Sequence, residues 1–162
     1  MAVDMFVVLD GIKGETADKA FGSKGGIDIL AWSWGMSQSG TTHTGTGGGA
    51  GKVNVQDVSF TKYIDNASPS LVQQCCNGAH IKKASLFVRK AGKTPLIYVQ
   101  LDMENLIISS VSTGGSGGED RLTENVTLNF SKFNFTYFKQ KPDGSGDKVG
   151  PVGWNIAQNV KV

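Results

Sequence analysis

Two long apolar stretches joined by a glycine-rich segment constrain the fold of this 162-residue chain most strongly. The first stretch begins at Leu106, and the second begins near Arg121 and reaches Phe138, with residues 114–118 (GGSGG) between them. Extended strands with so flexible a join are suited to building an interface, and less suited to holding a rigid catalytic group. We therefore expect a strand-rich protein, not an enzyme, with no catalytic residue.

Composition indicates one globular domain that spans residues 1–162. Hydrophobic residues make up 39% of the chain and charged residues 19%, which is ordinary for a protein with a packed core. The formal net charge is only +2, and lysine and arginine form no run. The sequence therefore predicts no binding to nucleic acid and no binding to an anionic membrane.

The N-terminus and the cysteines bear on the cellular compartment. The first apolar run ends at Asp10, which is too short for a signal peptide or a membrane span, so we expect cytoplasmic synthesis and no membrane insertion. Cys75 and Cys76 are adjacent and cannot join distant parts of the chain. We interpret both as buried thiols.

Alternation of apolar and polar residues at period two runs through most of the chain. It is clear over residues 3–9, 97–103 and 154–162, so each of these segments is expected to be a strand, the last one half-buried. Two predicted strands change phase partway, near Gln56-Asp57 and near Ser131-Lys132. A bulge produces such a switch and bends the strand, as happens when a strand passes from one sheet to another. The pattern predicts a mainly β protein: a bulged antiparallel β-barrel of two sheets, closed or nearly closed.

One short helix of about ten residues interrupts the strands. Ser68 is a suitable N-cap, Pro69 fits the first helical position, and Gly78 can adopt the left-handed conformation that ends a helix. Its apolar residues are expected on one face that packs against the outside of the barrel, and they are Leu71, Val72, Cys75 and Cys76.

Motifs that would indicate chemistry are weak. Residues 46–53 resemble a phosphate-binding loop only loosely, because Thr46 replaces the leading glycine and Val53 replaces the hydroxyl residue. His43 and His80 have no other ligand at metal spacing and are expected to be exposed. The sequence therefore predicts no metal site and no cofactor.

The segment around two tryptophans separates bulky from small residues. Leu30, Trp32, Trp34 and Met36 share one face, and the opposite face is nearly bare. The tryptophans are expected in the barrel core together with Phe60 and Trp154. The bare face allows either a strand packed in a crowded monomer or a smooth surface toward a cavity, channel or neighbouring subunit, and its residues are Ala31, Ser33, Gly35 and Ser37.

These segments closely resemble the Hcp family (haemolysin-coregulated protein), the tube component of bacterial type VI secretion systems. The resemblance spans nearly the whole chain and is weakest over residues 13–26 and 139–152. It rests on ILAWSWGMS (29–37), KVNVQDVSFTKYID (52–65), SSVSTGGSGGEDR (109–121) and GWNI (153–156).

The resemblance implies a β-barrel with an external helix that forms a homo-hexameric ring. Such rings stack into a hollow tube inside a contractile sheath, and the tube is expelled through the baseplate behind a VgrG spike. The protein would thus be secreted by the type VI pathway without a signal peptide. The rings of this family also carry and protect small effector proteins in their lumen, as chaperones.

Site residues follow from that comparison as hypotheses. We expect Ala31, Ser33 and Gly35 to face the lumen and its effectors, with a subunit contact as the competing interpretation. We expect the loop from Gly40 to Lys52 to mediate ring stacking through Thr41, Thr42, His43, Thr44, Gly47, Gly48, Gly49 and Lys52.

Two other functions stay open at this point. The first is a bacteriophage-type tail tube protein, which shares the barrel-and-tube construction. The second is a monomeric β-barrel that binds a small ligand, with a bulky-and-small strand lining its pocket.

Overall fold

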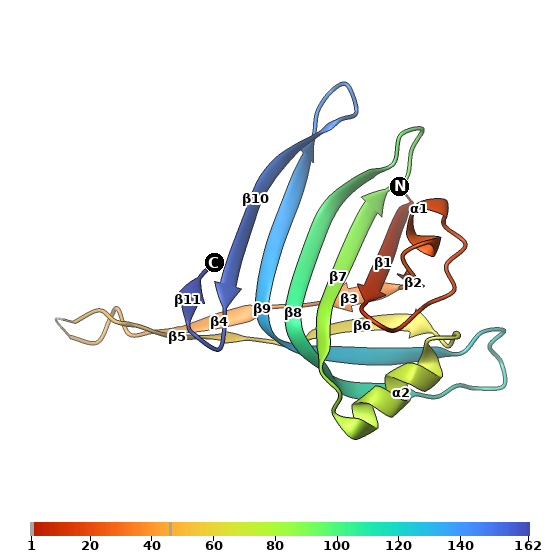
Figure 1. The fold of residues 1–162 in the computed structure, drawn as a ribbon. Coiled ribbons are helices and arrows are strands. Elements are labelled where there is room, and N and C mark those ends of the chain that lie inside the picture. The colour runs from red at the N-terminus through yellow and green to blue at the C-terminus, as the bar shows by residue number, and fades with distance from the viewer. Residues whose placement is uncertain (1, 46) are drawn as a thin grey trace.

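The computed structural model describes residues 2–45 and 47–162, and the fold is mainly β, as predicted. Figure 1 shows an upper sheet of steep strands above a flatter lower sheet, with a hairpin projecting to one side. The elements are β1 (Val3–Leu9), α1 (Lys19–Gly22), β2 (Ile27–Asp28), β3 (Ala31–Ser33), β4 (Met36–Gly40), β5 (Ala50–Val55), β6 (Val58–Tyr63), α2 (Ser68–Asn77), β7 (Ile81–Lys90), β8 (Leu96–Thr113), β9 (Thr123–Gln140), β10 (Gly146–Asn155) and β11 (Val160–Lys161).

The long strands β8 and β9 connect the two sheets, because each of them runs through both (Figure 1). In the upper sheet β9 lies between β8 and β10, and in the lower sheet it lies between β8 and β6. The buried positions of β9 change phase between Phe130 and Phe133, which confirms the switch predicted near Ser131.

The strand β8 bends opposite that point, which the sequence analysis did not predict. Its buried residues change from Leu101 and Met103 to Leu106 and Ile108. Asn105, between them, has a positive φ of 51°, a conformation that asparagine tolerates better than most residues. The bulge in the β8–β9 register lies further along, between Ile108 and Ser110.

The barrel is not closed by continuous strand pairing. β1 pairs with β2, and β3 pairs with β6, so the gap lies between β2 and β3. Two backbone hydrogen bonds span it: Ile29 N donates to Met5 O at 3.0 Å, and Leu30 N donates to Thr61 O at 2.7 Å. The predicted fold class, a mainly β protein of two sheets, is confirmed. Strand pairing does not run all the way round, so the barrel is not fully closed.

The phase switch at Gln56-Asp57 marks a change of sheet and not a bulge within one strand. β5 ends at Val55 and pairs only with β4, forming a separate two-stranded sheet, whereas β6 begins at Val58 and pairs in the lower sheet. The predicted position was correct, but the chain makes the change by ending one strand and starting another.

The core lies between the two sheets and holds Phe60, which is 1% exposed. Trp32, Trp34 and Trp154 are half-buried and pack against this core. Trp34 is in edge-to-face contact with Phe133, with ring centroids 4.8 Å apart.

The helix α2 has the predicted length and the predicted left-handed end at Gly78, with φ 63°. The prediction that Ser68 is the N-cap was wrong, because the helix already includes it. Its hydroxyl donates to Glu124 Oε1 at 2.5 Å, in a buried cluster of polar groups. The prediction of two buried thiols was also wrong: Cys75 packs partly against the core, but Cys76 is exposed.

Two further differences concern the ends of the chain. A second helix, the single turn α1, forms because Asp18 accepts hydrogen bonds from the backbone N–H groups of Ala20 and Phe21. The predicted last strand over residues 154–162 is instead the end of β10, a turn and the short β11, because Asn159 adopts a φ of 56° and reverses the chain.

Candidate functional site: a polar face, an arm and a groove

Four strands of the lower sheet expose a surface of small polar side chains. The sheet order there is β3, β6, β9 and β8, so the residues of each strand align in rows across it. One row contains Ser33, Ser59, Thr127 and Ser110, and the next contains Ala31, Thr61, Asn125 and Ser112. We call these eight residues the polar face.

Side chains of the polar face bond to one another across the strands. Ser59 and Thr127 hydroxyls lie 3.1 Å apart, and Thr61 Oγ1 donates to Asn125 Oδ1 at 2.6 Å. The reverse side of the same strands carries apolar residues such as Phe60 and Val126, which are buried. One side of this sheet is thus core, and the other is an even surface without charged groups.

The structure places two of the three residues predicted to face the lumen on the polar face. Ala31 and Ser33 are exposed there, whereas Gly35 lies beyond the end of β3, where an added Cβ would be 3.2 Å from Gln56 Oε1. The sequence analysis did not include the six face residues of β6, β8 and β9. A sequence pattern could have predicted these residues, because small polar residues alternate with apolar ones in β6 and β9.

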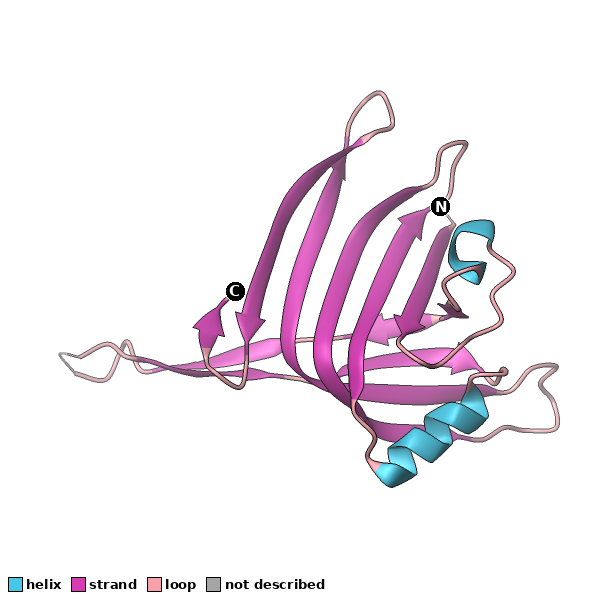
Figure 2. Ribbon diagram, viewed as in Figure 1, coloured by secondary structure: helices cyan, strands magenta, loops and turns pink. Residues whose placement is uncertain are grey.

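The β4–β5 hairpin, residues 36–55, projects far from both sheets, and we call it the arm (Figure 2). All the predicted stacking residues lie on it and are exposed: Thr41, Thr42, His43, Thr44, Gly47, Gly48, Gly49 and Lys52. Its end is organised by hydrogen bonds from Thr41 Oγ1 to Gly49 O at 3.2 Å and from Thr44 Oγ1 to Thr41 O at 3.1 Å. Thr46, which entered the comparison with a phosphate-binding loop, lies outside the described residues.

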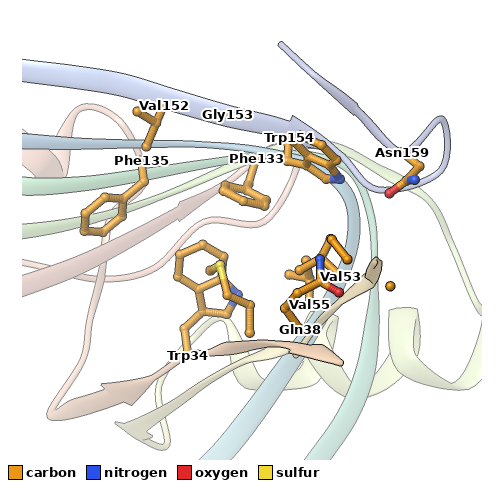
Figure 3. A pocket seen from close by; sticks show the side chains of 13 residues that line it. Trp34, Gln38, Val53, Val55, Phe133, Phe135, Val152, Gly153, Trp154 and Asn159 are labelled. Carbon is orange, nitrogen blue, oxygen red and sulfur yellow. The ribbon is translucent and has the colours of Figure 1, made fainter. Parts of the chain in front are cut away.

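An apolar groove of about 710 Å³ lies between the base of the arm and the upper sheet. In Figure 3, Trp34 and Val55 lie on one side of the groove, and Phe133 and Trp154 face them from the other. Val152 and Met36 also line the groove, and both are largely exposed. No charged residue is among the described residues that line it.

Two carboxylates of the long strand β8, Asp102 and Glu104, take part in structural contacts. Asp102 accepts a hydrogen bond from Ser85, and Glu104 lies 3.3 Å from Lys132 Nζ. Both histidines are exposed, and no group of three or more His, Cys, Asp or Glu in residues 2–45 and 47–162 is placed to hold a metal ion. In those same ranges, no helix has the length and apolar character needed to cross a membrane.

Comparisons with known proteins agree with this geometry. Residues 6–137 match the family described as "Type VI secretion system effector, Hcp". Protein hcp1 of Pseudomonas aeruginosa is 57% identical over 164 aligned positions, which cover 99% of each chain. The solved structure of Hcp1 from Salmonella typhimurium superposes with a TM-score of 0.80 at 37% identity, covering 100% of both chains.

A further solved structure, described as a type six secretion system protein, has a TM-score of 0.92 at 27% identity. It covers 99% of this chain and 100% of its own. The family match, the identity over nearly the full length and the shared fold together show that the chain belongs to the Hcp family of type VI secretion proteins.

Proposed function

We propose that this chain is a structural subunit of the type VI secretion inner tube, and that it acts by assembly and not by catalysis. Six copies form a ring, the rings stack into a hollow tube, and the polar face lines the lumen. The observation that carries the proposal is this face: four strands whose core side is mainly apolar and whose other side is small, uncharged and even.

The edges of the lower sheet support ring closure by strand pairing. β8 pairs with β7 only as far as Leu106, and β3 pairs with β6 alone, so both outer strands have an edge with no strand partner in the described chain. The four strands are antiparallel throughout, so β3 and β8 run in opposite directions. The β8 edge of one copy can therefore continue antiparallel into β3 of the next, which also protects both edges.

Stacking of rings is assigned to the arm. It is an exposed two-stranded ribbon outside the core, so it reaches beyond its own subunit without disturbing the fold. Its glycines and threonines supply backbone and hydroxyl groups for hydrogen bonding, and it has one positive charge, at Lys52, in the described residues.

The remaining parts of the proposal concern partners and cargo. The tube lies inside a contractile sheath on a baseplate, carries a VgrG spike and is secreted. Small effector proteins travel in the lumen, where Ala31 and Ser33 and the rest of the polar face contact them, while Gly35 borders that surface. A wall of short side chains supports this role, because it leaves the lumen free of projections.

Light scattering coupled to size-exclusion chromatography tests the ring. The chain has a mass of 17.2 kDa, and we expect an assembly of about six times that mass. A stable monomer at all protein concentrations would contradict the proposal. It would favour a second candidate, a monomeric ligand-binding protein, for which the apolar groove is the supporting observation.

A further inference from the structure

The apolar groove is incomplete in a single chain. One wall belongs to the arm, which has only two strands, and an isolated two-stranded sheet is marginally stable in water. Met36 on that wall is 47% exposed, and Val152 on the opposite wall is 60% exposed. Apolar side chains left open on both walls indicate a surface that another group covers.

The polarity of the lining restricts what can cover the groove. The indole Nε1 of Trp154 is shielded from solvent and has no hydrogen-bond acceptor among the described residues. Because that N–H is already covered by its own chain, it offers no contact to an entering group, and the groove presents mainly apolar packing. The absence of charged residues from the described lining makes an ionic partner unfavourable.

The outer face of α2 has the matching properties. The helix contains no charged residue. Val72 and Cys76, four residues apart, lie on one exposed side of it, and Val72 is 43% exposed.

The two surfaces lie on different sides of the molecule. In Figure 1, α2 is at the lower right, away from the arm and the C-terminal strands that enclose the groove. One chain cannot fill its own groove with this helix, but neighbouring copies can do so in a head-to-tail contact. Such a contact between two different surfaces generates a ring when the rotation closes.

We propose that the groove of each copy receives the outer face of α2 from a neighbouring copy. This inference rests on the proposed ring and names one of its contacts. Val72 and Cys76 enter between Met36 and Val152. The contact adds side-chain packing to the pairing of the β3 and β8 edges.

Cross-linking through the native Cys76 tests the contact. In a Cys75→Ser background, Val152→Cys and Met36→Cys each place a thiol on one wall of the groove. We expect mild oxidation of the assembled ring to yield a ladder of disulfide-linked oligomers on a non-reducing gel. Two controls are expected to give no ladder: adding Cys76→Ser, and Val149→Cys, which places an exposed thiol on the same strand outside the groove.

Labelling of Cys76 in the Cys75→Ser ring supplies a second measurement without changes to the groove. We expect a maleimide to react with Cys76 at least about tenfold more slowly in the ring than in protein unfolded by guanidinium. A ring of the expected mass whose Cys76 reacts at the unfolded rate, or that gives no ladder with either groove thiol, would overturn this contact and leave the proposed function intact. Failure of the unmodified chain to form any ring would instead count against the proposed function itself.

Discussion

Lys62 Nζ lies 2.6 Å from Glu124 Oε1, at directly paired positions of β6 and β9, and neither side chain is reached by solvent. The same ammonium group lies 2.8 Å from Asp65 Oδ1 and donates to Ser68 Oγ at 3.1 Å. The cluster therefore fastens the start of α2 to the lower sheet. It also explains why Ser68 contributes its hydroxyl to the core and not to a helix cap.

Replacing Lys62 with methionine should destabilise the fold strongly. It leaves the carboxylates of Glu124 and Asp65 buried without a counter-charge, a change that usually costs about 3–5 kcal/mol. Urea unfolding followed by circular dichroism measures the loss. The matched control is Lys132→Met, which removes a partly exposed pair with Glu104 and should cost less than about 1 kcal/mol. Equal losses in the two variants would contradict the assigned role of the cluster.

Stability should depend on pH through Asp18. A hydrogen bond from Arg89 holds the pKa of Asp18 below its usual value of 3.8, and the N–H groups of Ala20 and Phe21 act in the same direction. Because the folded pKa is lower than the unfolded one, the stabilisation is complete above the unfolded value and is lost as pH falls through the folded value.

The free energy of unfolding of Asp18→Asn should therefore be lower than that of the native chain at pH 7, and the difference should shrink below about pH 4. Chemical denaturation at a series of pH values measures it. The exposed position Asp10 supplies the control variant Asp10→Asn, whose difference should stay small throughout. A constant difference for Asp18→Asn at every pH would show that its ionisation contributes nothing.

The bend in β8 should depend on the conformational tolerance of Asn105. Alanine at a positive φ is strained, so Asn105→Ala should cost about 1 kcal/mol, whereas Asn105→Gly should be nearly neutral. Thermal unfolding of both variants measures the difference. Identical melting temperatures would mean that the strand adopts another backbone geometry at this position.

Ser33→Gln should leave the mass of the proposed ring unchanged and lower the recovery of a lumenal effector severalfold in co-purification. The longer side chain would project from the polar face, where Ser33 is aligned with Ser59 and Thr127. Thr94→Gln, at the exposed tip between β7 and β8, is the control and should retain the effector. If the Ser33→Gln ring instead dissociates into subunits, Ser33 forms a subunit contact.

Deleting residues 42–50 should separate ring formation from stacking. The deletion removes the end of the arm but retains the pairing of Met36 with Val55 and of Gln38 with Val53, so the fold and the ring should persist. Tube formation at matched protein concentration should fall sharply in sedimentation and negative-stain electron microscopy. Tubes as abundant as those of the full chain would refute the role of the arm.

Local patterns predicted those parts of the fold that depend on neighbouring residues. Alternation around Trp32 and Trp34 placed both tryptophans against the core as predicted, although Leu30 and Met36 of the same face are exposed. The phase changes gave the places where the chain moves between sheets. The bend in β8 at Asn105 could also have been predicted from the sequence, because apolar residues change from odd to even positions across it.

Features that depend on distant contacts could not be predicted in this way. Ser68 has the sequence context of a helix cap, and only the buried charges of Lys62 and Glu124 divert it. Cys76 was expected on a packed helical face with apolar residues, yet it is exposed. Most residues that line the groove come from β4, β5, β9 and β10, which no local sequence pattern connects.

The hydrogen bonds within the polar face have a kinetic consequence. Thr61 already donates to Asn125, and the hydroxyls of Ser59 and Thr127 already form a hydrogen bond with each other. A protein passing along this surface in the proposed tube meets no charged group on the face and two side-chain pairs that are already bonded to each other, so each adhesive contact is weak and short-lived. Such a wall favours rapid unloading of cargo at its destination over tight retention in transit.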